Sequence, residues 1–191
     1  MTAAAPAPWD GHGLPTLASL RACGAVPHYF GLGFVQLKLS DTRRLHFWHP
    51  SCEAIVGEEE IHDHRYDFVS HVLAGTVVHE TWDYSPCADG GVEAFKVSCK
   101  PGVPSDPAPS SRGKASRTGM YSLAAGSFYR FPAGAFHRSE GKSAVTSLTR
   151  GPVVLEEATV LRPLGAPPVC AFSRPMPEAD CWAAIADMLP S

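Results

Sequence analysis

Two histidines one residue apart, His62 and His64, are the residues of this sequence with the clearest potential for chemistry. They lie in the segment GEEEIHDHRYDFVSHVLAG. Alternate side chains of an extended segment point to the same side, so both imidazoles are expected to face one way. Neutral imidazole is a common ligand of divalent transition metals. The pair therefore predicts a metal site that a third group must complete.

A third histidine, His137, follows a sharp change of chain direction in the segment AAGSFYRFPAGAFHRSEG. Pro132 restricts the backbone, and Gly134 permits a tight turn directly before the histidine. This local sequence is suited to aiming a single side chain from the start of a new strand. His137 is thus a candidate to complete the site.

The two segments together resemble the paired motifs of the cupin superfamily. The second motif of that family reads G-x5-P-x-G-x2-H-x3-N, and residues 126–137 match it through the histidine, with Gly141 in place of the final asparagine. The first motif reads G-x5-H-x-H-x3,4-E-x6-G. Here Gly57 comes one residue late before His62, the HxH is present, and Gly75 closes the motif. The resemblance spans roughly residues 30–160 and implies an all-β cupin fold, a double-stranded β-helix or jelly-roll barrel.

One position departs from the family pattern. The glutamate of the first motif should lie at position 68 or 69, which Phe68 and Val69 occupy. The resemblance therefore implies a site of three histidines, His62, His64 and His137, as metal ligands. Three neutral ligands leave the ion its full charge and leave open positions for a bidentate substrate and dioxygen. The alternative is a barrel interior in which the histidines are hydrogen-bonded core residues without metal.

Within the superfamily, the segment IHDHRYDFVSHVLAGTVVHETWDY resembles the three-histidine thiol dioxygenases, the cysteine and cysteamine dioxygenase group. The segment GAFHRSE and the later pair Ser147-Leu148 are similar to their second half. The resemblance implies bound iron, with a substrate thiolate and dioxygen as the reacting partners. Cysteine dioxygenase has a histidine and a tyrosine where this chain has Thr149 and Gly151, and the cysteine that some members crosslink to a tyrosine has no counterpart.

The leading interpretation is a mononuclear non-haem iron(II) dioxygenase that acts on a small molecule, with thiols as one substrate class. A second interpretation is a metal-dependent isomerase, epimerase or lyase that uses nickel, zinc or manganese as a Lewis acid. A third is a cupin that binds a ligand without turnover, because one fold can host all three roles.

Three further side chains are candidates for catalytic roles: Tyr66, His79 and Glu80. Tyr66 shares the parity of the histidine pair, so it is expected to face the metal and donate a hydrogen bond to a bound substrate or oxygen species. Of His79 and Glu80, which are adjacent, one should point inward and could serve as a general base or support a ligand. Phe68 is expected to fill the space of the missing glutamate. His46 has no partner pattern and is expected to be structural.

Short strands separated by turn residues are needed to bring these groups together. They are expected at 30–39, 43–49, 64–73, 76–84, 92–98, 120–124, 127–132, 144–150 and 153–162. This spacing is typical of a sandwich or barrel.

The domain organisation follows from these patterns. Residues 1–27 are expected to form an N-terminal arm with a short helix, and residues 28–163 the barrel. Residues 164–191 are expected to form a C-terminal extension with another short helix. Residues 100–119, rich in proline and poor in apolar side chains, are expected to be a flexible insertion.

Composition narrows the partners of the protein. The chain has 191 residues, 45% of them hydrophobic, and a net charge of −3 without a basic block, so nucleic acid is not expected as a partner. No apolar run reaches the ~18 residues of a membrane helix, and the first residues lack a secretory pattern. We therefore expect a cytoplasmic protein with reduced cysteines. The apolar strand at 30–39 is a candidate edge for a homodimer.

Overall fold

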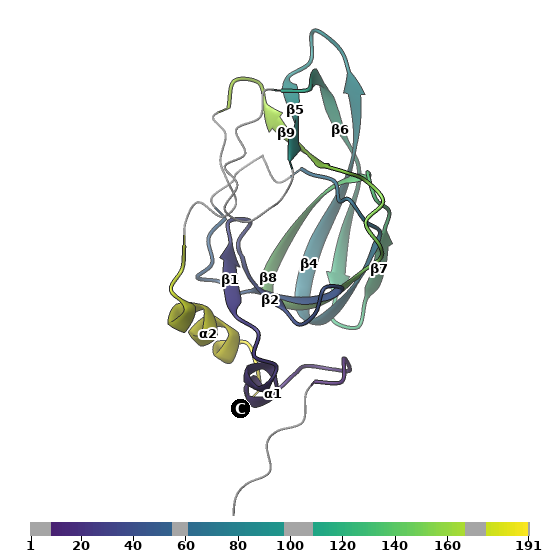
Figure 1. The fold of residues 1–191 in the computed structure, drawn as a ribbon. Coiled ribbons are helices and arrows are strands. Elements are labelled where there is room, and N and C mark those ends of the chain that lie inside the picture. The colour runs from purple at the N-terminus through teal and green to yellow at the C-terminus, as the bar shows by residue number, and fades with distance from the viewer. Residues whose placement is uncertain (1–8, 55–60, 98–108, 167–174, 191) are drawn as a thin grey trace, which may run out of the picture.

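Antiparallel strands form most of the described chain, with one short helix near each end (Figure 1). The structure is a computed structural model that describes residues 9–54, 61–97, 109–166 and 175–190. Helix α1 spans Leu17–Ala22 and helix α2 spans Glu178–Asp187. The prediction of an all-β fold with two short helices is confirmed.

The strands form a single curled sheet. Their bounds are β1 Pro27–Phe30, β2 Phe34–Lys38, β3 Arg43–Trp48, β4 Phe68–Pro86, β5 Val92–Val97, β6 Ser111–Ala124, β7 Phe128–Phe131, β8 Phe136–Arg150 and β9 Ala158–Pro163. Their order is β1-β2-β3-β8-β4-β6-β5-β9, and β7 pairs with β4. All the strand pairs are antiparallel.

The segment around His62 closes the curl of this sheet. His62 forms isolated bridges both to His137 at the start of β8 and to Val160 in β9. Hydrogen bonding therefore runs from β8 through β4, β6, β5 and β9 and back to β8. The histidine pair is built into the seam at which the sheet meets itself.

Strand β4 is the central element of the sheet. It continues through Gly75, whereas the sequence predicted two strands separated by a turn there. Gly75 adopts a φ of +69°, and the pairing with β8 shifts register around it. A Cβ at this glycine would lie 2.0 Å from the carbonyl oxygen of Ser143, so the strand bends here without breaking only because no side chain is present.

Strands β2 and β3 have two different faces. Alternate residues such as Leu37, Leu45 and Phe47 are fully buried in a core cluster that also contains Ile185 of α2. The other face of these strands lines the inside of the curled sheet. Because side chains alternate along a strand, Arg44 and His46 of β3 face that interior.

Further predicted elements differ from the structure: the strand predicted at 144–150 already begins at Phe136, and the strand predicted at 153–162 begins only at Ala158. The single strand predicted at 30–39 is a hairpin, β1 and β2, because the chain turns at Gly33 with a φ of +92°. The insertion predicted at 100–119 is wrong in its second half, since β6 already begins at Ser111. Residues 100–108 of that predicted insertion lie outside the described residues.

No helix in the described part of the chain has the length and apolar content needed to cross a bilayer. The described cysteines, Cys23, Cys52, Cys87 and Cys181, carry free thiols.

Candidate metal centre

Backbone hydrogen bonds fix the histidine pair between two strands. The His62 N–H donates to the His137 carbonyl at 3.0 Å, and the His137 N–H donates back at 2.9 Å. On the other side, the N–H of Asp63 donates to the Thr159 carbonyl of β9 at 2.9 Å. The backbone that carries His62 is thus held directly against the backbone that carries His137.

Asp63, between the two histidines, points away from them and anchors the segment to β9. Its carboxylate accepts a hydrogen bond of 2.6 Å from the Thr159 N–H, and the side chain is only 5% exposed. Burial raises the pKa of Asp63, and hydrogen bonding to Thr159 partly offsets this effect. This contact keeps Asp63 on one side of the chain and the two imidazoles on the other.

The turn before His137 is tied to the same segment. Gly134, with a φ of +75°, donates its N–H to the His64 carbonyl at 3.0 Å. The Ala133 N–H donates to the Asp67 carboxylate at 2.8 Å. The turn predicted from Pro132 and Gly134 thus positions His137 and also supports the chain around His64.

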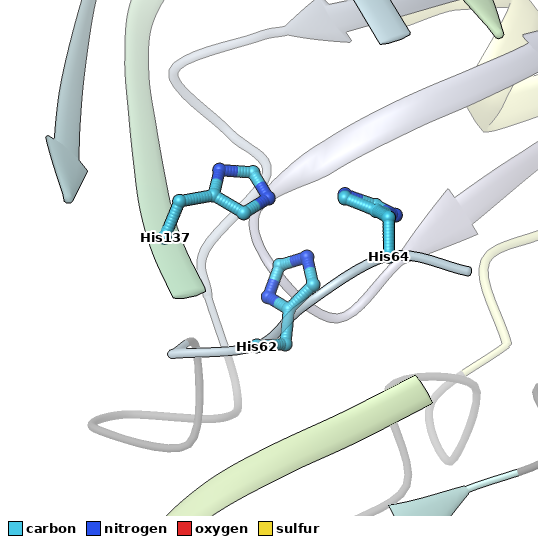
Figure 2. Close-up of side chains that lie close together, drawn as sticks. All are labelled: His62, His64 and His137. Carbon is cyan, nitrogen blue, oxygen red and sulfur yellow. The ribbon is translucent and has the colours of Figure 1, made fainter. Parts of the chain in front are cut away.

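The three imidazole rings point toward one another (Figure 2). The His137 ring centre lies 4.6 Å from that of His62 and 5.0 Å from that of His64, and the last two are 4.9 Å apart. One ring nitrogen of each histidine lies within 4.8 Å of the others. Since metal–nitrogen bonds are about 2 Å long, the rings need to close by only about 1 Å around a single ion.

The protonation of these histidines suits metal binding. Burial lowers the pKa of His64 and of His137 well below the usual value, and the nearby His62 lowers both further. His137 is 4% exposed, and neither of its ring nitrogens has a hydrogen-bond partner among the described residues. A buried polar group without a partner costs about 1–3 kcal/mol, so the structure leaves a nitrogen lone pair ready for an ion.

Two aromatic side chains, Phe68 and Tyr66, pack against the histidines. Phe68 is 2% exposed, and its ring centre lies 5.0 Å from His64 and 5.6 Å from His137. Its ring supplies only apolar atoms to this side of the cluster. Tyr66 stacks on His64 at 5.3 Å. Among the described histidine, cysteine and acidic side chains, the group that could hold one metal ion here consists of the three imidazoles.

Of the adjacent candidates His79 and Glu80, the histidine faces the site. The His79 ring centre lies 5.1 Å from that of His137, and Nδ1 lies 2.9 Å from the Ser139 hydroxyl. Burial lowers the pKa of His79 to about 4. Its Nε2 is buried without a hydrogen-bond partner in the described chain.

Glu80 lies on the opposite side of β4 and takes no part in the three-histidine cluster. Its carboxylate lies 2.7 Å from Arg117 and 3.0 Å from Arg138. Burial alone would raise the pKa of Glu80, but the two arginines outweigh it and lower the pKa. The hypothesis that Glu80 supports or replaces a ligand does not fit this orientation, because both of its oxygens face arginines.

The sequence analysis missed the side chains that β3 and β8 contribute to the interior. The guanidinium carbons of Arg44 and Arg150 lie 5.6 and 5.1 Å from the centre of the Tyr66 ring. Arg44 also contributes to the low pKa of His64 and of His46. The alternation of Arg44, His46 and Trp48 along a predicted strand was the available signal, since it puts polar and aromatic groups on one face.

His46 is a neutral member of this interior. Burial first, and then the charge of Arg44, lower its pKa to about 3. The Gln36 amide nitrogen lies 3.3 Å from Nε2, and the Thr146 hydroxyl lies 3.5 Å from Nδ1. With the amide as donor, Nδ1 carries the proton and donates to Thr146.

Comparisons with known proteins give little beyond this description. No family model matches the chain, and no curated protein matches it. One similar solved structure is hydroquinone 1,2-dioxygenase from Sphingomonas sp. TTNP3 with 4-hydroxybenzoate bound, at 14% identity and a TM-score of 0.30. The match covers 60% of this chain and 63% of that one. At this TM-score the likeness does not bear on activity, so the function has to be argued from the site.

Proposed function

We propose that the chain is a cupin that binds one divalent metal ion through His62, His64 and His137 and works as a mononuclear iron(II) dioxygenase on a small molecule. The observation that carries the proposal is the buried His137 ring, whose nitrogens have no partner in the described structure and which faces two further imidazoles. Three neutral donors and no carboxylate suit a borderline metal such as iron, nickel or zinc.

Bound iron(II) with three protein ligands would supply open coordination positions at which dioxygen and an organic substrate can be held together. The side chains around it have separate roles. His62 and His64 come from one rigid segment and His137 from a second, so the backbone bonds between them fix the spacing. Phe68 excludes water from one side of the cluster, because its buried ring contacts both His64 and His137.

Tyr66 and His79 are the polar groups that lie beside the ligands. We assign Tyr66 the role of hydrogen-bond donor to a bound substrate, since its ring stacks on His64. His79 is neutral at pH 7 because its pKa is lowered to about 4. We assign it the role of orienting group near His137, held through its hydrogen bond to Ser139.

The test is oxygen consumption by protein that has been reconstituted anaerobically with iron(II). A panel of thiols, amino acids and phenols should reveal at least one substrate that stimulates oxygen uptake. His137→Ala should abolish this uptake, whereas His28→Ala, which changes an exposed histidine of β1, should retain it. The absence of uptake with every member of the panel would contradict the assignment as an oxygenase.

Analysis of the bound metal and of any bound ligand distinguishes the two alternative functions. A redox-inert metal in freshly purified protein would favour the isomerase, epimerase or lyase alternative, in which the ion acts as a Lewis acid. A ligand that is released unchanged on denaturation would favour a binding protein without turnover.

A further inference from the structure

A buried carboxylate on the side of β4 that faces away from the candidate metal centre links three neighbouring strands. Glu80 is 4% exposed, and its Oε1 accepts a hydrogen bond of 2.7 Å from Nη1 of Arg117 in β6. Its Oε2 lies 3.0 Å from Nε of Arg138 in β8. We call Arg117, Glu80 and Arg138 the ion triad. It takes no part in the three-histidine cluster, so the donor set of the metal site gives no reason for it.

Strand register places the ion triad directly behind His137. Glu80 pairs with Arg138 across β4 and β8, and the adjacent pair is Thr81 with His137. Successive side chains of a strand project to opposite faces. The Arg138 side chain therefore leaves the backbone of β8 on one face, and the His137 ring leaves it on the other face at the preceding residue. A shift of this backbone at Arg138 also moves His137.

A β-bulge brings the second arginine to Glu80. The pairing of β4 with β6 shifts register after Thr81, so that β6 has one extra residue, Thr118, next to Arg117. In a regular strand Arg117, three positions from the residue opposite Glu80, would point to the other face. The bulge turns Arg117 to the face of Glu80.

The start of β8 depends on β4 because it has little support along its other edge. Among the described residues, β3 pairs with β8 from Ala144 onward. Before that residue, the described chain offers this edge the isolated bridge between His62 and His137. The contacts with β4 therefore largely determine where the start of β8 lies.

Stability alone does not explain the ion triad. Replacement of a buried ion pair by apolar side chains is often neutral or stabilising. Charge-assisted contacts are directional, so a slip of β8 along β4 would separate the Arg138 guanidinium from Glu80. A buried carboxylate that loses a partner is unfavourable. The ion triad thus disfavours every register of β8 except the observed one.

We propose that the ion triad positions the metal ligand His137 by fixing the start of β8 against β4. The ion triad then determines how tightly, and with which geometry, the three histidines bind a metal ion. This inference rests on the proposed function and adds positioning residues to the same centre. It gives Glu80 an indirect role in place of the direct role that the sequence suggested.

The test uses cobalt(II), because its visible absorption bands depend on the number and arrangement of its ligands. Metal-free protein is titrated with cobalt(II) without oxygen, in the presence of a competing chelator that allows the affinity to be measured. Glu80→Gln keeps the size of the side chain and removes its charge. It should weaken cobalt(II) binding about tenfold or more and shift the absorption bands of the bound ion.

Variants of Arg138 extend the test and carry it alone should Glu80→Gln fail to fold. Arg138→Gln should weaken cobalt(II) binding and shift the bands in the same way. Arg138→Lys keeps a charged donor, so its affinity and its spectrum should lie closer to those of the wild type.

Lys114→Gln is the matched control, because it breaks an exposed ion pair on the same strand as Arg117. The Lys114 ammonium lies 3.0 Å from the Asp89 carboxylate. The cobalt(II) affinity and bands of this control should equal those of the wild type. Urea denaturation of every variant measures stability separately. A purely structural role of the ion triad would lower stability and leave the affinity and the bands of the folded protein unchanged.

The outcomes separate the two proposals. Wild-type cobalt(II) affinity and bands in folded Glu80→Gln and Arg138→Gln would overturn the inference while the metal centre stands. Wild-type protein that binds no cobalt(II) would contradict the proposed metal centre, and the inference with it.

Discussion

At the scale of single residues, hydrogen-bond partners decide what each histidine can do. His137 is buried with both ring nitrogens unpartnered in the described structure, whereas the partly buried His46 has partners on both nitrogens. The first arrangement leaves a lone pair that an ion can use, and the second holds a neutral ring in place. The two histidines therefore have opposite roles although both have lowered pKa values.

His46 should make the stability of the metal-free protein depend on pH. Its folded pKa of about 3 lies below the usual 6.5, so the unfolded chain takes up a proton first as the pH falls. Its contribution to stability is complete above pH 6.5 and is lost progressively between pH 6.5 and about 3. Each pH unit in this window should cost up to about 1.4 kcal/mol of unfolding free energy.

His46→Gln should make the pH dependence of stability less steep, without removing it, because the lowered pKa values of His64, His79 and His137 act in the same direction. The measurement is urea denaturation of metal-free protein at pH 7, 6, 5 and 4. His28→Gln, at an exposed position, is the control and should leave the wild-type slope unchanged. An equal slope in wild type and His46→Gln would show that the pKa of His46 is not lowered in the folded protein.

Local sequence revealed the three histidines but not the arginines beside them. The HxH spacing and the Pro-x-Gly turn are each contained in a few residues, so their geometry follows from short-range rules. Arg44 of β3, Arg150 of β8 and Tyr66, two residues before β4, come from three separate segments. They meet because β3, β4 and β8 pair in one register. A single sequence carries no direct signal of that register.

At the scale of elements, the short segment 61–63 determines how the sheet closes and where the ligand histidines lie. It is not part of a long strand, yet it joins β8 to β9 and fixes the two histidines. The Asp63 carboxylate, bonded to the Thr159 N–H, is the side-chain anchor of this segment. Loss of that anchor should loosen the ligands without removing any of them.

Asp63→Ala should therefore weaken metal binding about 10- to 100-fold, which is typical for loss of an outer partner of a metal site. It should also lower the unfolding free energy by about 1–3 kcal/mol, because the buried Thr159 N–H loses its acceptor. Asp63→Asn is the control, because its amide oxygen can still accept this bond. Metal titration with a competing chelator, together with urea denaturation, would measure both effects, and equal losses in the two variants would contradict the anchoring role.

Gly75 should be far less tolerant of substitution than Gly126. Both have positive φ angles, but a Cβ at Gly75 meets the Ser143 carbonyl, whereas a Cβ at Gly126 meets nothing within 4 Å. Gly126→Ala should cost about 1–2 kcal/mol for its backbone conformation alone. Gly75→Ala should cost clearly more in thermal denaturation, and equal costs would contradict the close packing of β4 on β8.

Burial of one face made some strand boundaries predictable. The bounds of β3 agree with the predicted strand because Leu45 and Phe47 alternate with more polar residues. The first half of β6, from Ser111, has few buried side chains and reads as a loop in the sequence. Its strand conformation is imposed by pairing with β4 and β5, a tertiary effect that hydrophobic patterning does not register.

At the scale of the whole molecule, the sheet closes on itself at the candidate centre. The ring of hydrogen bonds through β8, β4, β6, β5 and β9 ends at His62 and His137. The backbone hydrogen bonds that close the sheet therefore also bring the imidazoles together. A metal ion at this seam would tie the two ends of the ring, so metal binding should also stabilise the fold.

Metal stoichiometry by elemental analysis tests the central claim most directly. Wild-type protein and His28→Ala, purified in parallel and equilibrated with iron(II) without oxygen, should each retain close to one ion per chain after desalting. His62→Ala, His64→Ala and His137→Ala should each retain almost none while circular dichroism shows an unchanged fold. Equal metal content in wild type and His137→Ala, or no metal in folded wild type, would contradict the three-histidine centre.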